Sequence, residues 1–147
     1  MAKLRMKTVA LVLLAGTILP APGIMHNAAH AAGCYRSSCN GLFPAAQGCT
    51  ADAQQLDQAA VGSYGTVYLK YSPTCDAAWA EYYFTSPYAY SFVEYKPGSS
   101  AYQSDYDSVS PAISRMGDAS TGVGQKAFAE AHRSNGTIIV TGQTNYH

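Results

Sequence analysis

Alternation of apolar and polar residues is the clearest pattern in this chain, and it predicts β-strands. Between Thr66 and Tyr71, the apolar Val67 and Leu69 alternate with more polar neighbours. This period of two is typical of a strand with one buried face. The same alternation, or a high content of aromatic and β-branched residues, predicts strands at 66–71, 79–85, 88–95 and 137–141.

Three further segments are less distinct. In Thr50–Val61, alanine and glutamine favour a helix with Thr50 or Asp52 as its N-cap. In Gln125–Arg133 the residues again favour a helix, although Phe128, Glu130 and His132 also alternate as in a strand. The polar segment 101–115 contains Pro111, so we expect a loop there with at most a short strand.

Turn signals separate these segments and set the fold class. They are Gly62-Ser63-Tyr64-Gly65, Ser72-Pro73, Lys96-Pro97-Gly98-Ser99 and Asn135-Gly136. Short strands at such spacing are typical of an all-β sandwich or a partly open barrel. Because the chain shows no internal repeat and no linker, we expect one β-rich domain over residues 32–147.

The N-terminal residues have the pattern of a secretory signal peptide. Three basic residues precede an apolar run of 12 residues, Thr8 to Leu19, which is shorter than the ~20 residues that cross a membrane. Ala29-His30-Ala31 has small residues at the two positions that a signal peptidase recognises. We therefore expect a signal peptide over 1–31, export by the general secretory route and no transmembrane span. The alternative is a lipoprotein with a lipidated Cys34, but the apolar run ends well before this cysteine.

Cleavage after Ala31 changes the charge of the protein. The formal net charge of the whole chain is zero, and the mature 116 residues keep six Lys and Arg against nine Asp and Glu, a net charge of −3. A sparse and slightly negative charge does not favour nucleic acid as a partner. We expect a monomer that needs no cofactor.

Four cysteines lie in the mature part, namely Cys34, Cys39, Cys49 and Cys75. An even number in an exported chain predicts two disulfides, and no C-x2-C pair suggests a metal site. Three pairings are open. Loop-closure entropy favours Cys34–Cys49 with Cys39–Cys75, because longer closed loops restrict the unfolded chain more.

The cysteine region also carries a family resemblance. The matching residues are the four cysteines, Asn40-Gly41, Pro44, Gly48, Asp52-Ala53, the run Gly65 to Cys75 and Trp79-Ala80. On these residues the chain resembles the YjfA family of secreted bacterial proteins (domain of unknown function 2690). The resemblance implies export, a bacterial source and a compact β-rich fold, with a strand after Cys49. It implies no activity.

No catalytic constellation is visible in the mature sequence. Its two histidines are His132 and His147, and an exposed strand position is expected for His132, which lies near Glu130. Glu81, Glu94, Asp105 and Asp107 show no spacing that marks a glycosidase pair. Asp105 and Asp107 could together offer two ligands to calcium, but a solvated loop is favoured because no third acid follows.

Tyrosine is the unusual residue of this chain, with 12 copies, seven of them between Tyr82 and Tyr106. Tyrosine combines a large, stiff contact area with a polar tip, which suits glycan and protein surfaces. The candidate binding residues are Tyr82, Tyr88, Tyr90, Tyr95, Tyr102 and Tyr106. The alternative is that these rings fill the core or cover a sheet.

We therefore expect a non-catalytic extracellular module that binds a cell-surface glycan or protein. A protease inhibitor or a small hydrolase is the alternative function, because a disulfide-pinned loop such as Tyr35–Gly48 would lose little entropy on binding a protease. A passive structural protein is the third possible function.

Overall fold

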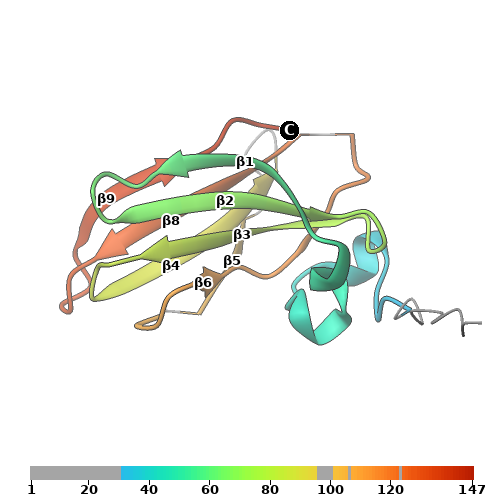
Figure 1. The fold of residues 1–147 in the computed structure, drawn as a ribbon, viewed down its shortest axis with the longest axis horizontal. Helices are drawn as coiled ribbons and strands as arrows, with labels where there is room; N and C mark the ends of the chain where they lie inside the picture. The colour runs from blue at the N-terminus through green and yellow to red at the C-terminus, as the bar shows by residue number, and fades with distance from the viewer. Residues whose placement is uncertain (1–30, 96–100, 106, 123) are drawn as a thin grey trace, which may run out of the picture.

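Two antiparallel sheets stack face to face as a sandwich in the computed structural model, which describes residues 31–95, 101–105, 107–122 and 124–147 (Figure 1). The first sheet has the strand order β1-β2-β3-β6, with β7 also paired to β3, and the second has the order β5-β4-β8-β9. Neither sheet closes into a barrel. The strands are β1 Gln54–Ala60, β2 Gly65–Ser72, β3 Ala77–Phe84, β4 Tyr88–Tyr95, β5 Ala101–Gln103, β6 Ala112–Ile113, β7 Gly117–Asp118, β8 Gln125–His132 and β9 Ile138–Gln143.

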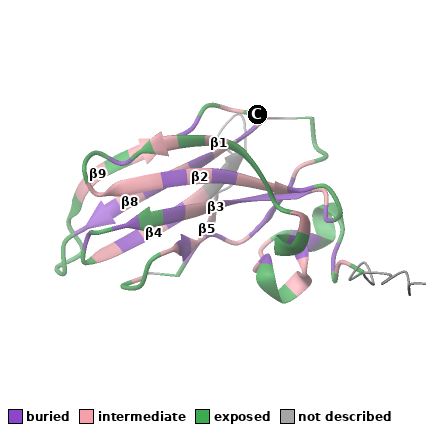
Figure 2. Cartoon of the chain, in the orientation of Figure 1, coloured by how far each residue is buried: buried purple, intermediate pink, exposed green. Residues whose placement is uncertain are grey.

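Three 3-10 turns precede the first strand: η1 Arg36–Cys39, η2 Ala45–Gln47 and η3 Cys49–Asp52. They gather at the end of the sandwich where the β2–β3 hairpin turns (Figure 1). Figure 2 shows exposed positions in the turns and in the edge strands β1 and β9, whereas β2 and β3 carry many of the buried ones.

The expected all-β sandwich is confirmed, and so are the four predicted strands, which became β2, β3, β4 and β9. The helix expected from composition in Thr50–Val61 is wrong, and β1 confirms the strand that the family resemblance implied. The segment 101–115 contains two short strands, β5 and β6. The predicted signal peptide, apart from Ala31, and the predicted turn at 96–99 lie outside the described residues.

The helix that residue propensities favoured at Gln125–Arg133 is also wrong, because these residues form β8. Ala127, Ala129 and Ala131 are fully buried on one side of the strand, while their neighbours point to the other side. In a helix these three alanines would not share one face, since a helix repeats every 3.6 residues. Burial of the alternating alanines therefore outweighs the helical propensity of the segment.

The core places large side chains of the first sheet against small side chains of the second. Val67, Leu69 and Tyr82 point inward from β2 and β3. The inner face of β8 offers the methyl groups of Ala127, Ala129 and Ala131 to them. Large residues facing small ones allow two sheets to interdigitate without voids. The two sheets are joined by a buried hydrogen bond of 3.0 Å, which the Ser91 hydroxyl in β4 donates to the Ala112 carbonyl oxygen in β6.

β1 and β9 are edge strands of the two sheets, and β9 lies close to the end of β1. A Cβ atom on Gly142 would lie 2.5 Å from the Ala60 carbonyl oxygen, so only glycine allows this approach. The contact continues where the Asn145 amide donates to Asp57 Oδ2 at 3.0 Å. The two sheets therefore approach each other closely at this edge, and these contacts hold the C-terminal strand against β1.

Tyr82→Phe is expected to stabilise the protein by about 1 kcal/mol, because the change removes a buried polar atom that has no partner. Tyr82 is 0% exposed, and no described residue accepts a hydrogen bond from its hydroxyl. Burial raises the pKa of this hydroxyl to about 12. Urea unfolding followed by circular dichroism would measure the change. Tyr68→Phe on the outer side of β2 is the control, and equal stabilisation of both variants would contradict the prediction.

Candidate functional site

One disulfide closes a short loop around η1, and the other joins η3 to the β2–β3 turn. Cys34 pairs with Cys39, and Cys49 pairs with Cys75, which confirms that all four cysteines form disulfides. The pairing favoured by loop-closure entropy is wrong. The four sulfur atoms lie within 4.8 Å of one another, and Cys34 Sγ is 3.9 Å from Cys49 Sγ. Several pairings are thus close in space, and the local backbone rather than the loop length selects among them.

Trp79 is the centre of a second apolar cluster built around these disulfides. The side chains of Ala77, Trp79 and Met116 pack with the four cysteines, and all are buried. Lys70 and Trp79 face each other across β2 and β3 on the outer side of the first sheet. The disulfide-linked turns therefore cover one end of that outer face. The Trp79 indole N–H donates to Glu81 Oε1 at 2.9 Å, which satisfies its polar atom.

Asp52 fixes the β2–β3 turn, which contains the Ser-Pro-x-Cys part of the family motif. Its carboxylate accepts hydrogen bonds from the Ser72 hydroxyl at 2.6 Å, the Thr74 amide at 2.8 Å and the Thr74 hydroxyl at 2.5 Å. Desolvation raises the pKa of the Asp52 carboxyl, but the bonds from Ser72 and Thr74 together outweigh it and lower the pKa below 3.8. The Asp52 carboxylate is therefore a structural group.

Asp52→Asn is expected to cost about 2 kcal/mol at neutral pH, because charge-assisted hydrogen bonds are lost. The folded-state pKa of Asp52 is depressed, so its stabilisation is present above the ordinary value of 3.8 and disappears as the pH falls through the folded value. The wild type should therefore lose more stability below about pH 4 than the variant does. Denaturant unfolding at several pH values measures this difference. Asp105→Asn, whose side chain is 74% exposed, is the control, and parallel pH profiles of wild type and Asp52→Asn would contradict it.

The outer side of the second sheet carries a row of aromatic rings, which we call the aromatic face. It consists of Tyr88, Tyr90, Phe92, Phe128, Glu130 and His132. These residues pair across β4 and β8, and the neighbours whose side chains are described are buried on the inner side, namely Ala89, Ser91, Ala127, Ala129 and Ala131. The ring centroids of Tyr90 and Phe92 are 6.0 Å apart, those of Phe92 and Phe128 are 5.3 Å apart, and those of Tyr90 and His132 are 5.2 Å apart. The four rings thus form one continuous contact chain over two strands.

His132 is buried in this face, whereas the sequence predicted an exposed position. Its side chain is 6% exposed because it lies beside the Tyr90 ring and the β8–β9 turn. The Nε2 atom lies 2.9 Å from Glu130 Oε2, and the Nδ1 atom lies 3.1 Å from the Gly136 carbonyl oxygen. Both ring nitrogens therefore face oxygen acceptors. This geometry positions the imidazole as a fixed part of the surface.

The predicted tyrosine cluster is divided between the core and the aromatic face. Tyr88 and Tyr90 are half-buried on the aromatic face. Tyr82 belongs to the core, so its assignment to a binding surface is wrong, because its position in β3 points inward. Tyr102 also packs against the core. Tyr95 ends β4 opposite Gln125 and only its backbone is described, while Tyr106 lies outside the described residues.

Sequence reasoning missed Phe92, Phe128 and Glu130 as members of this surface. Strand alternation over 88–95 puts Phe92 on the same face as Tyr88 and Tyr90, and this signal could have found it. Phe128 was hidden by the helical interpretation of its segment. Their proximity depends on the β4–β8 pairing, in which Phe92 lies opposite Phe128.

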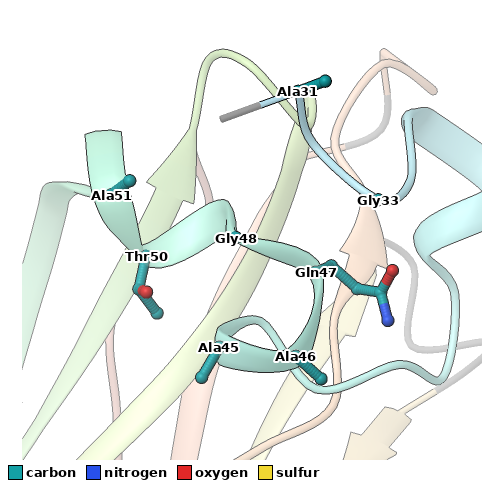
Figure 3. Close-up of a pocket in the computed structure, with 8 residues that line it drawn as sticks. All are labelled: Ala31, Gly33, Ala45, Ala46, Gln47, Gly48, Thr50 and Ala51. Carbon is teal, nitrogen blue, oxygen red and sulfur yellow. The ribbon is translucent and has the colours of Figure 1, made fainter. Parts of the chain in front are cut away.

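A separate hollow of about 440 Å³ lies among the N-terminal turns (Figure 3). Its lining is mostly alanine methyl groups and glycine backbone, with one amide from Gln47 and one hydroxyl from Thr50. None of these lining groups titrates near neutral pH. The hollow therefore offers no acid or base for catalysis.

Fold and surface define a small disulfide-linked β-sandwich with an aromatic outer face. The family model described as a protein of unknown function, DUF2690, matches residues 37–144, and the chain belongs to this family. No curated protein and no solved structure matches it. Within the described part of the chain, no helix is long and apolar enough to span a membrane. The two disulfides fit an extracellular protein.

Proposed function

We propose that the protein is a secreted, non-catalytic module that binds a neutral cell-surface glycan on its aromatic face. The observation that carries the proposal is the continuous row of half-buried rings from Tyr90 to Phe128, flanked by the Glu130 carboxylate. Aromatic ring faces offer apolar contact area to the C–H faces of sugars. A carboxylate beside them accepts hydrogen bonds from sugar hydroxyls and fixes the orientation of the ligand.

The size and charge of the surface favour a glycan over a protein. Stable protein interfaces use roughly 20–30 residues on each side. The aromatic face is a strip of six residues over two strands, which suits a narrow polymer better. The mature chain has a net charge of −3, so an anionic polymer would be repelled and a neutral one would not.

The same geometry supports binding without catalysis. The imidazole of His132 holds a carboxylate at one nitrogen and a backbone carbonyl at the other. A general base needs a nitrogen directed at the proton of the nucleophile. His132 instead supports the neighbouring Tyr90 ring from the side, at 5.2 Å and an interplanar angle of 75°.

The mature protein is expected to adsorb saturably to insoluble polysaccharide, and Tyr90→Ala and Phe92→Ala should each weaken adsorption by roughly 5- to 150-fold. Each variant removes a ring that would stack on the sugar, a contact of about 1–3 kcal/mol by analogy with base stacking on aromatic side chains. Depletion of protein from solution over chitin, cellulose and purified bacterial cell wall would measure the affinity.

Tyr83→Ala is the matched control, because Tyr83 is 48% exposed on the outer side of the first sheet. It removes a tyrosine ring from the opposite side of the molecule. Thermal unfolding must show that all three variants fold. Adsorption that is unchanged in Tyr90→Ala and Phe92→Ala, or lost equally in Tyr83→Ala, would contradict the proposal. It would also be contradicted if the wild type adsorbed to none of the three polymers.

A further inference from the structure

An apolar cleft with two carboxylates shares no residue with the aromatic face. It encloses about 280 Å³ between the N-terminal turns and the chain that leads into β6. Five apolar side chains and two acidic ones line it: Phe43, Pro44, Ala45, Pro111, Ile113, Asp105 and Asp107. A cleft of this kind offers apolar walls to a ligand's methylene groups and carboxylates to its positive charge.

The backbone of Asp107 is held firmly, in contrast to the solvated loop expected from the sequence. Its amide donates to the Ala89 carbonyl at 3.1 Å and its carbonyl accepts from the Ala89 amide at 2.9 Å, which forms a β-bridge to β4. Three residues earlier, the Ser104 amide donates to the Ser91 carbonyl at 2.8 Å. The backbone that carries the Asp107 carboxylate is therefore already ordered at the cleft, which lowers the entropic cost of binding a ligand there.

The two carboxylates of the cleft differ in their partners. Arg115 lies 3.5 Å from Asp105 and stacks on the Phe43 ring, 4.3 Å from the ring centroid. Within the described part of the chain, Asp107 has no cationic partner. Desolvation and the nearby Asp105 raise the pKa of the Asp107 carboxyl. A cation bound beside Asp107 would oppose both effects, because an opposite charge favours the ionised carboxylate.

We propose that this cleft binds a primary alkylammonium group, the chemistry of a lysine side chain on a partner protein. The Asp107 carboxylate accepts hydrogen bonds from the ammonium group, and the side chains of Pro44, Pro111 and Ile113 enclose the methylene chain. Lysine is suited to such a site because a long apolar stem carries a compact charge. The site is independent of glycan binding on the aromatic face.

Nuclear magnetic resonance titration of the ¹⁵N-labelled mature protein tests the proposal, with Nα-acetyl-lysine methylamide as the probe. We expect saturable shifts of the backbone signals of Ala45, Asp107 and Ile113. Nα-acetyl-norleucine methylamide has a similar stem without the charge and should bind at least tenfold more weakly. The Asp107 carboxyl should titrate at a lower pH when the lysine probe is present.

Asp107→Asn should weaken binding of the lysine probe at least tenfold. Asp57→Asn is the matched control, because it changes the net charge equally and lies on β1, at the far edge of the first sheet from β6. Equal binding of both probes to the wild type, or unchanged binding to Asp107→Asn, would overturn the proposal. The comparison of probes needs no variant, so it stands even if a substitution disturbs folding.

Discussion

Removal of the Cys49–Cys75 disulfide by a double alanine substitution is expected to lower the free energy of unfolding by about 3.5 kcal/mol. This disulfide closes a loop with a sequence separation of 26 and ties η3 to the β2–β3 turn. Without it, the unfolded chain regains the conformational freedom of that whole loop. The same change at Cys34 and Cys39, with a separation of 5, should cost only about 2 kcal/mol.

Guanidinium unfolding of both double variants, followed by Trp79 fluorescence, measures this difference of about 1.5 kcal/mol. The two variants control for each other, because each removes two buried sulfur atoms from the same cluster. A larger loss in the Cys34/Cys39 variant would contradict the prediction. It would indicate that Cys34–Cys39 acts through native packing around Trp79 rather than through the unfolded chain.

Trp79→Ala is expected to destabilise the protein by about 3–5 kcal/mol, the largest effect of any single substitution considered. The side chain is 0% exposed and touches both the sheet and the disulfide cluster. Its removal would leave a cavity between β3 and the N-terminal turns, which the disulfides would keep from collapsing. Trp79→Phe keeps most of the volume and loses the hydrogen bond to Glu81, so it should cost about 1–2 kcal/mol.

Because Trp79 is the only tryptophan, unfolding of these variants must be followed by circular dichroism. Tyr83→Ala on the same strand is the control and should change stability by no more than about 0.5 kcal/mol, since Tyr83 is 48% exposed. A similar loss in Tyr83→Ala and Trp79→Ala would show that aromatic residues of β3 act through strand propensity. The prediction requires that the loss of stability is larger in Trp79→Ala than in Tyr83→Ala because Trp79 is buried and Tyr83 is exposed.

The two substitutions at Trp79 also illustrate what a local pattern can and cannot reveal. Its aromatic-rich surroundings predicted a strand, and β3 confirms it. Strand alternation places Trp79 on the outer side of the first sheet, where a polar residue is usual. It is buried because Met116 and the disulfide-linked turns, which lie more than 25 residues away in the chain, cover that end of the sheet.

The candidate site follows the same rule. The alternation in Tyr88–Tyr95 could be read from the sequence, and it places Tyr88, Tyr90 and Phe92 on one face of β4. Which face would be outside was not readable, because both faces carry apolar or aromatic residues. The alanines of β8 decide this, since they fill the core side and leave Phe128 beside Phe92.

By itself, the sequence determined the all-β class, the strands with clear alternation and the participation of all four cysteines in disulfides, because these depend on local periodicity and on cysteine number. The tertiary structure alone decided the cysteine pairing, the strand at Gln125–His132, the burial of Tyr82 and the position of Asp107 at β4. Each of these depends on contacts between segments that are distant in the chain. Such contacts outweigh local propensity because burial and backbone pairing contribute more free energy per residue than propensity does.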